Sequence, residues 1–413
     1  MRLQEAGDEL RHILFLSRTP TAVLAVVLFC AAAIFSFTPT GEQQFSYLAQ
    51  SFLRGSLHFL ESPGTWADAT PFDGKYYWPL GPFPAVVLVP FVAIADGFGI
   101  FFYQGYLLFA LTAGIFLLWY AIARVVSFRQ RDAFLLALTF VFGSGYILLA
   151  MIPWSWYFAQ AVAVFLVSWA VYEYLTKRRS WVLGILMAAV SMTRITAGVG
   201  ALFFVLDILF LSKKTWKEKR HDAVKFCTPL LCAGILLGLY NFARFGDFFD
   251  QGYALQYMVS EQLRNVRGAG LFSFVHIPTN AYYLFLSAPL PVMRDIMTPI
   301  LTLPFLRPDV WGMGIFFTSP YLLSLFFVRY RERVHAVLLG TIGSIVALLL
   351  VYWGTGYSQY GYRYAFEFFP FLFLLFLIVY KARGALLSGG MRVLLLSSIA
   401  FNFYLFMVFF VYR

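Results

Sequence analysis

The chain is a series of long apolar stretches separated by short, strongly basic connections. Runs of about 17–25 apolar residues have the length that an α-helix needs to cross a hydrocarbon layer roughly 30 Å thick. Hydrophobic residues fill 61% of the 413 positions, and a water-soluble domain could not bury apolar surface on that scale. A transmembrane barrel needs short alternating strands, which this pattern does not contain. The sequence therefore predicts an all-α polytopic membrane protein.

Lysine and arginine gather in the connections and predict an orientation. The positive-inside rule places such clusters in the cytoplasm, so the net charge of +11 indicates topology and no nucleic-acid partner. The clusters are Arg124/Arg129/Arg131, Lys177/Arg178/Arg179, Lys213 to Lys225, Arg329/Arg331/Arg333 and Lys381/Arg383/Arg392. The spans predicted between them are 103–123, 133–150, 157–175, 182–193 with 197–211, 226–242, 313–328, 334–353, 366–380 and 393–411. We expect a bundle of about 11–12 transmembrane helices.

The same pattern divides the chain into six parts. They are a cytoplasmic interfacial helix at 1–19, a first transmembrane helix at 20–37, a first extracytoplasmic loop with juxtamembrane helices at 38–80, transmembrane helices over 81–242, a large extracytoplasmic loop at 243–312, and C-terminal transmembrane helices over 313–413. The 243–312 loop is too apolar for a free linker, so we expect amphipathic helices lying on the membrane surface. A cleaved signal peptide is an alternative for the first span, because Cys30 to Ala33 are small.

Two apolar segments fit the charge pattern only as short pieces. Residues 81–96 contain three prolines and predict a short or re-entrant helix that begins at the outer face. The alternative is a true span that violates the positive-inside rule downstream. Residues 182–211 satisfy the rule as two short helices that meet near Thr193-Arg194, which places Arg194 at or near the outer face. One long tilted helix would not keep both flanking clusters in the cytoplasm.

Glu42 is the first candidate for chemistry. It follows the helix breakers Pro39 and Gly41 directly after the first span. The apolar residues that recur behind it at helical spacing are Phe45, Leu48, Ala49, Phe52 and Leu53. A surface helix would then begin beside a carboxylate that can act as a general base. The alternative is that Glu42 only caps this helix, because acids favour helix N-termini.

The second candidate region runs from Asp68 to Pro84. Asp73-Gly74 is a turn signal, and Lys75, Tyr76 and Tyr77 follow it. Tyrosine and tryptophan here are typical of an interfacial aromatic belt. That reading does not account for Lys75, because an outward-facing lysine goes against the charge bias. A lysine at the membrane surface can hold a lipid phosphate as a point charge.

Two arginines complete the candidates. Arg363 lies between two spans, where it can face an anionic head group or pair with Glu367 four residues on. Arg194 lies in an apolar segment, and a charge at membrane depth is costly and usually functional. A salt bridge to a partner elsewhere in the chain explains Arg194 equally well. The three cysteines lie in apolar segments and the five histidines lack ligand spacing, so neither a disulfide nor a zinc site is predicted.

These residues together resemble the GT-C superfamily of polytopic glycosyltransferases, in particular bacterial and archaeal relatives of the protein O-mannosyltransferases and aminoarabinose transferases. Glu42 and the residues that follow it resemble that family's acid and "LAxSLLxG" run, and the turn with Gly81-Pro82 resembles its "GKYY…PPG" pattern. The matching pieces are Gly41 to Gln43, Tyr47 to Gly55, Asp73 to Tyr77, Thr193 to Thr196, Tyr240 to Asp247, Thr318 to Pro320 and Gly361 to Tyr364.

The resemblance implies a GT-C-like bundle and a glycosyltransferase. It would move a sugar from a polyprenyl-phosphate carrier to a lipid, glycan or protein acceptor at the extracytoplasmic face, with inversion and with Glu42 as the general base. The residues implied in donor binding are Lys75, Arg194, Arg363, Asp73, Tyr76 and Tyr77. The family often has two adjacent acids where this chain has Glu42-Gln43, which favours an enzyme that needs no metal and no cofactor.

The implied partners are membrane lipids, the lipid-linked sugar donor and an acceptor that the sequence does not identify. The implied location is multi-pass in a prokaryotic plasma membrane, in the service of the cell envelope. Two other classes stay open. A lipid or lipid-linked-sugar flippase also needs broken helices and charges at membrane depth. A non-catalytic GT-C-like scaffold of envelope assembly would keep the architecture without the reaction.

Overall fold

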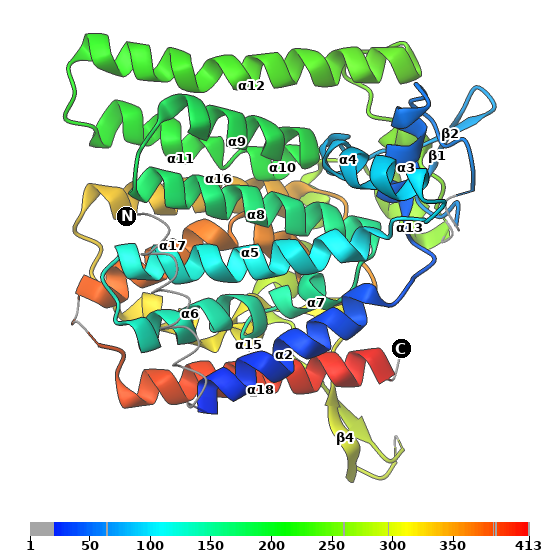
Figure 1. The fold of residues 1–413 in the computed structure, drawn as a ribbon. Helices are drawn as coiled ribbons and strands as arrows, with labels where there is room; N and C mark the ends of the chain where they lie inside the picture. Colours follow the sequence, from blue (N-terminus) through cyan, green and yellow to red (C-terminus); the bar gives the residue numbers. More distant parts are fainter. Residues whose placement is uncertain are drawn as a thin grey trace.

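The computed structural model describes residues 20–62, 65–258, 261–295, 297–382, 384 and 386–411. The predicted interfacial helix at 1–19 lies outside them. Within the described residues, six helices have the length and composition to cross a membrane: α2 (Pro20–Phe37), α5 (Gln104–Val125), α8 (Ser155–Leu175), α12 (Trp216–Phe245), α16 (Arg333–Val351) and α18 (Gly389–Val411). They lie side by side in one bundle (Figure 1). The predicted class, a helical membrane protein, is confirmed.

Shorter helices complete the bundle around its centre. They are α3 (Gln44–Leu53), α4 (Phe83–Gly97), α6 (Gln130–Phe142), α7 (Tyr146–Met151), α9 (Ser180–Thr193), α10 (Ile195–Gly198), α11 (Ala201–Leu206), the π-helix η2 (Asp207–Leu211) and α17 (Phe369–Ala382). Helix α8 lies at the centre of the bundle and α12 at its rim, because 78% of the apolar stretch of α8 is buried, against 17% of that of α12. The exposed apolar face of α12 is the face that a bilayer would cover.

The bundle has two chemically different ends. The basic clusters at 124–131, 177–179, 213–225 and 329–333, with Lys381 and Arg392, lie at one end, here called the basic end, which is on the left in Figure 1. The other end, here called the loop end, holds the C-termini of α2, α9, α12 and α16 and the N-termini of α5 and α8. This segregation is the pattern that the positive-inside rule predicts.

Helix α4 enters and leaves the bundle at the loop end. Before it, Gly81 packs so closely on the C-terminus of α9 that a Cβ atom would lie 2.0 Å from the carbonyl oxygen of Met192. Near its end, Asp96 accepts a hydrogen bond of 3.1 Å from Gln50 of α3. Since α5 also begins at the loop end, α4 does not traverse the bundle, in agreement with the prediction for residues 81–96.

Helix α9 ends where the sequence places the break. Arg194 has an extended backbone, with φ −149° and ψ 113°, and α10 starts at the next residue. The chain then returns toward the basic end, where Tyr174 of α8 donates a hydrogen bond of 2.7 Å to Asp207. The prediction of two short helices that meet at Thr193-Arg194 is confirmed.

Two predicted spans have different structures. The span at 313–328 is wrong as a continuous α-helix, because Pro320 lacks an N–H group and Ser319 before it leaves helical geometry. The chain there forms α15 (Ile315–Thr318) and the 3-10 helix η6 (Pro320–Phe327). The span at 133–150 is divided between α6 and α7 by the residues from Gly143 to Gly145. Glycine at both positions weakens the helix there.

The large loop contains strands as well as short helices, which corrects the prediction of interfacial helices alone. Its elements are η3 (Tyr253–Leu255), α13 (Glu261–Gly268), η4 (Phe274–His276), α14 (Ile277–Ala281), the π-helix η5 (Tyr282–Leu286), β3 (Leu290–Met293), β4 (Leu301–Arg307) and β5 (Trp311–Met313). The β3–β4 hairpin is antiparallel and projects beside α18 (Figure 1). Strand β5 pairs in parallel with β6 (Gln359–Gly361), which joins the large loop to the connection that carries Arg363.

Candidate active site

The chain at Glu42 is fixed to the starts of α5 and α8. The side-chain amide of Gln104 donates to the carbonyl oxygen of Glu42 at 3.0 Å and to that of Pro153 at 2.6 Å. The hydroxyl of Ser155 accepts a hydrogen bond of 3.0 Å from the backbone amide of Gln44 and lies 3.4 Å from the carbonyl oxygen of Glu42. Glu42 is half-buried, and it lies one residue before Gln43, the N-cap of α3. The main chain therefore holds this residue in place at the loop end.

Asp68 is a half-buried acid of the first loop, and its carboxylate points to the start of α8. Its carboxylate accepts hydrogen bonds from the indole N–H of Trp156 at 3.0 Å and from the amide of Gln256 at 3.2 Å. Burial raises the pKa of Asp68, while the Trp156 hydrogen bond and the charge of Arg363 act against that rise. Asp68 also has a left-handed backbone, with φ +65°, which is uncommon for a residue other than glycine.

The backbone around Asp68 joins the first loop to the large loop. Tyr257 donates its amide to the carbonyl of Ala69 at 2.8 Å, and the Thr70 hydroxyl donates to the carbonyl of Gly252 at 3.0 Å. Strand β1 (Thr70–Phe72) therefore starts against residues that lie more than 180 positions further along the chain. The first loop and the large loop therefore form one unit at the loop end of the bundle.

Arg363 lies in a cage of aromatic rings. Its guanidinium carbon is 5.8 Å, 5.5 Å and 5.1 Å from the ring centroids of Trp156, Tyr157 and Tyr364, respectively. It also donates a hydrogen bond of 3.3 Å to the Tyr364 hydroxyl. Trp156 thus contacts Asp68 through its N–H group and Arg363 through its ring face. The first turn of α8 brings Glu42, Asp68 and Arg363 to one end of the bundle.

Arg194 forms the buried ion pair of the site. Its Nε and Nη2 atoms donate to one carboxylate oxygen of Glu367 at 2.9 Å and 2.7 Å, and the two side chains are 7% and 0% exposed. The suggested pairing of Arg363 with Glu367 is therefore wrong. Residues Arg363–Glu367 form the 3-10 helix η7, in which positions four apart do not share a face. Tyr364 lies between the two arginines, with its ring 5.3 Å from Arg194.

A cavity of about 320 Å³ lies beside Arg194. It combines polar residues of α9, α10 and the large loop with apolar side chains from α12 and α16. The lining residues include Ser191, Thr193, Thr196, Asp250, Gln251, Tyr253, Leu237, Leu271 and Leu349. Phe249 also lines it and is 95% exposed, so the cavity reaches the surface of the protein. Burial raises the pKa of the Tyr253 hydroxyl, so this group stays a neutral hydrogen-bonding group in the wall.

The remaining predicted site residues lie on a hairpin at the outer edge of the loop end. Strands β1 and β2 (Lys75–Tyr77) are joined by Asp73-Gly74, both with positive φ, as a tight two-residue turn requires. Lys75 is exposed. The partial burial of His58 and the charge of Lys75 lower the pKa of His58. Tyr76 stacks on Trp66 at 4.2 Å, whereas Tyr77 is buried against Phe245.

The structure thus separates the predicted residues into two groups. Glu42, Arg363 and Arg194 belong to one network through α8 and Tyr364, while Asp73, Lys75 and Tyr76 face outward on the hairpin. Sequence reasoning did not single out Trp156, Gln256 or Tyr364. Trp156 and Gln256 act through contacts between segments that are far apart in sequence, and no local pattern marks them. Tyr364 lies in the matching piece Gly361 to Tyr364, but its contact with Arg194 does not follow from that piece.

In the part of the chain that the structure describes, no cluster of three or more His, Cys, Asp or Glu side chains could hold a metal ion. Metal independence stays a prediction. Arg244 is another buried arginine of the loop end, where it donates to the carbonyl of Trp78 at 2.8 Å and to Asn241 at 2.7 Å. Its guanidinium lies 3.9 Å from the ring of Tyr240. The loop end is therefore cationic as well as acidic.

Fold and site together define an integral membrane protein with a buried network of acids, arginines and aromatic rings at one end. No protein-family model matches the chain, and no curated protein matches it. Solved structures of the oligosaccharyltransferase of Archaeoglobus fulgidus are similar to it, with low TM-scores and low sequence identity. The apo form has a TM-score of 0.42 and 13% identity, and the form tethered to an acceptor peptide has a TM-score of 0.41 and 14% identity.

A third structure, of the same archaeal enzyme with an inhibitory peptide and a dolichol-phosphate, has a TM-score of 0.41 and 16% identity. The three alignments cover 94%, 96% and 93% of this chain and 55% of the other chain in each case. This chain therefore spans little more than half the length of the solved oligosaccharyltransferase. Likeness at this level assigns the chain neither a family nor an activity.

Proposed function

We propose that the protein is a glycosyltransferase that moves a sugar from a polyprenyl-phosphate carrier to a hydroxyl group of a lipid, glycan or protein acceptor. The observation that carries the proposal is the first turn of α8, which holds the chain at Glu42 through Ser155 and contacts Arg363 through Trp156. Transfer from a phosphate needs a base for the incoming hydroxyl and a cation for the leaving group. This helix start contacts the candidate for each role, Glu42 for the base and Arg363 for the cation.

The reaction has one chemical step. Glu42 takes the proton of the acceptor hydroxyl, whose oxygen attacks the anomeric carbon. The bond from that carbon to the phosphate oxygen breaks, its electron pair leaves with the polyprenyl phosphate, and the anomeric configuration inverts. Because the phosphate is already a good leaving anion, it needs charge stabilisation more than protonation, so the step requires neither a metal nor a cofactor.

Contacts rank the candidate cations. Arg363 comes first, because aromatic rings surround it and its guanidinium fork suits a phosphate. Arg194 is already paired with Glu367, so we assign it to shaping the pocket beside the phosphate. Lys75, with Asp73 and Tyr76, is assigned to the donor head group outside the buried network, since its hairpin extends from the loop end (Figure 1). Tyr77 is buried against Phe245, so we assign it to holding this hairpin in place.

The cavity beside Arg194 suits the part of the donor next to the phosphate. Its apolar wall comes from α12 and α16, and the neighbouring residues of α12, Ile235 and Leu236, are exposed as lipid-facing residues are. Its polar wall faces Arg194 and Tyr253. An amphiphile with an isoprenoid tail and an anionic head has this distribution of chemistry.

The test uses purified protein in lipid nanodiscs with polyprenyl phosphate that carries a radiolabelled sugar. Glu42→Gln keeps the size of the side chain and removes the base, so we expect transfer to fall by about 10²–10⁴-fold. Glu61→Gln is the matched control, because Glu61 is an exposed acid of the same loop that pairs with Arg54. Its rate should equal that of the wild type.

Other outcomes identify the other classes. Transfer by Glu42→Gln at the wild-type rate contradicts the assignment of the base. Movement of the labelled lipid across the bilayer without cleavage of the sugar bond indicates a flippase. Binding of the labelled lipid with neither movement nor cleavage indicates a scaffold.

A further inference from the structure

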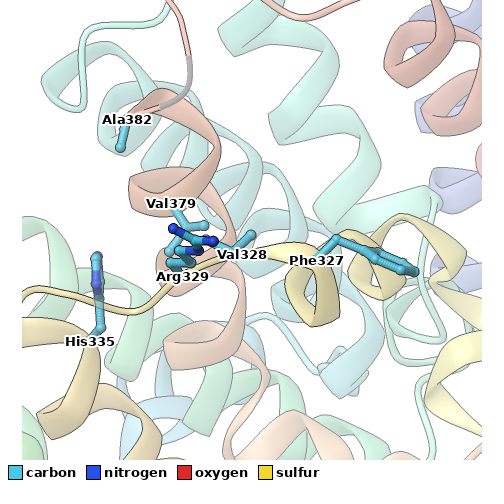
Figure 2. Close-up of a pocket in the computed structure, with 6 residues that line it drawn as sticks. All are labelled: Phe327, Val328, Arg329, His335, Val379 and Ala382. Atoms are coloured by element: carbon cyan, nitrogen blue, oxygen red, sulfur yellow. The ribbon is translucent and has the colours of Figure 1, made fainter.

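A second cavity lies at the basic end, on the opposite side of the bundle from the candidate active site. It has a volume of about 390 Å³ and lies between the start of α16, the end of α17 and the chain that leaves η6; Figure 2 shows the residues that line it. The residues that line it are Phe327, Val328, Arg329, His335, Val379 and Ala382. Helix α16 separates it from the loop end by its own length, about 28 Å.

His335 brings an unused hydrogen-bond donor to this cavity. Its Nδ1 atom accepts a bond of 3.3 Å from the backbone amide of Glu332, in the capping arrangement at the start of α16. A neutral imidazole that accepts at Nδ1 carries its proton at Nε2. That Nε2 atom is buried and has no hydrogen-bond partner among the described residues, in a side chain that is only 4% exposed. A buried N–H group without an acceptor is costly and calls for one.

The lining of the cavity combines a cationic side chain with apolar side chains. Arg329 lines it, is exposed, and forms no ion pair with a described residue. The Glu332 carboxylate caps the N-terminus of α16 and offsets the positive partial charge there, so Arg329 carries the cationic character of the cavity. Phe327, 80% exposed, and Val379 supply apolar surface next to Arg329. Lys381 is nearby in sequence, but its ammonium donates to the carbonyl of Ser127 at 2.7 Å.

We propose that this cavity binds the head group of an anionic phospholipid. A phosphate oxygen accepts hydrogen bonds from His335 Nε2–H and from the Arg329 guanidinium, while the first carbons of the lipid tails pack on Phe327 and Val379. The apolar wall and the place between two membrane helices favour a lipid over a free anion. Basic pockets between transmembrane helices at the cytoplasmic face are typical sites for such head groups. The proposal is independent of the transferase reaction.

The test measures retained ligand by native mass spectrometry of the full-length protein in detergent. The probes are phosphatidylglycerol, phosphatidylcholine and inorganic phosphate, each titrated separately. We expect saturable binding of phosphatidylglycerol alone. Equal retention of phosphatidylcholine would overturn the requirement for an anionic head, and equal retention of inorganic phosphate would show a simple anion site.

Variants locate the binding. Arg329→Ala and His335→Asn should each weaken phosphatidylglycerol binding about fivefold. Asparagine keeps an acceptor near the Glu332 amide and removes the Nε2 donor. Arg331→Ala is the matched control, because Arg331 belongs to the same basic cluster, is exposed and does not line the cavity. Equal losses in Arg331→Ala and Arg329→Ala overturn the proposal, and this comparison decides even if His335→Asn fails to fold.

Discussion

Among single residues, Glu367 has the clearest energetic role, because its fully buried carboxylate neutralises the buried Arg194. Removal of one partner leaves the other charge buried and unpaired. Glu367→Ala should therefore lower the free energy of unfolding by roughly 3–5 kcal/mol. Glu61→Ala breaks the exposed Arg54–Glu61 pair and should cost at most about 1 kcal/mol. Denaturant titration in detergent measures both, and equal losses would contradict the burial of the Arg194–Glu367 pair.

Asp68 makes stability depend on pH in a direction that can be worked out. Burial raises its pKa, so the folded protein keeps this proton at a pH where the unfolded chain has released it. The contribution of Asp68 to the free energy of unfolding therefore falls as the pH rises from the ordinary aspartate pKa through the raised one.

The variant Asp68→Asn isolates this effect. Its amide oxygen can accept from Trp156, and Gln256 can turn to present its Oε1 atom, which is buried without a partner among the described residues. The stability of the wild type relative to Asp68→Asn should decline between acidic and neutral pH. A difference that is constant, or that grows with pH, would contradict the raised pKa.

The sequence shows which single residues need a partner, but it does not identify that partner. A buried arginine such as Arg194 needs a counter-charge, and the sequence states that need through the apolar run around it. The partner lies 173 positions away, so no local spacing identifies it. The sequence suggests Glu367 only as a partner of Arg363, because the spacing of four residues assumes an α-helix. The chain forms a 3-10 helix there.

At the level of elements, Gly252 fixes the junction of the two outer loops. It has a positive φ of 81°, and a Cβ atom there would lie 2.6 Å from Phe245 and 2.8 Å from Thr70. Gly246, the C-cap of α12, also has a positive φ, of 73°, but has open space around it. The two glycines therefore separate backbone strain from crowding.

Gly246→Ala should cost about 1–2 kcal/mol of strain. Gly252→Ala should cost this and a further 1–3 kcal/mol, roughly, from crowding, and it should make residues 252–270 more sensitive to protease. Unfolding titrations and limited proteolysis test the pair. Equal losses in the two variants would show that the loops do not depend on this contact.

Elements defined by apolar length were predictable, and those defined by pairing were not. Helices α2, α5, α8, α16 and α18 follow from uninterrupted apolar runs between charges. Strands β5 and β6 depend on a contact between segments more than 40 residues apart, and their side chains resemble those of the neighbouring helices. The break at Ser319-Pro320 was readable in principle, but its apolar surroundings favoured a span.

For the whole molecule, the clusters of lysine and arginine at the basic end predict a topology. The basic end should face the cytoplasm and the loop end the other side. In a parent with Cys30, Cys227 and Cys232 replaced by alanine, Glu61→Cys and Lys214→Cys place exposed thiols at the loop end and the basic end.

An impermeant maleimide should label Glu61→Cys in intact cells and Lys214→Cys only after permeabilisation. The cysteine-free parent controls for background and should not react. The reverse labelling pattern would place Glu42 and Arg363 in the cytoplasm and would rule out transfer at the outer face.

The hold on residue 42 through its own carbonyl group has a practical result. Gln104 grips the peptide backbone there, and a backbone oxygen is the same whichever amino acid occupies the position. Substitution of residue 42 therefore leaves this hydrogen bond in place, and aspartate, histidine or cysteine at this position would vary the pKa of the proposed base.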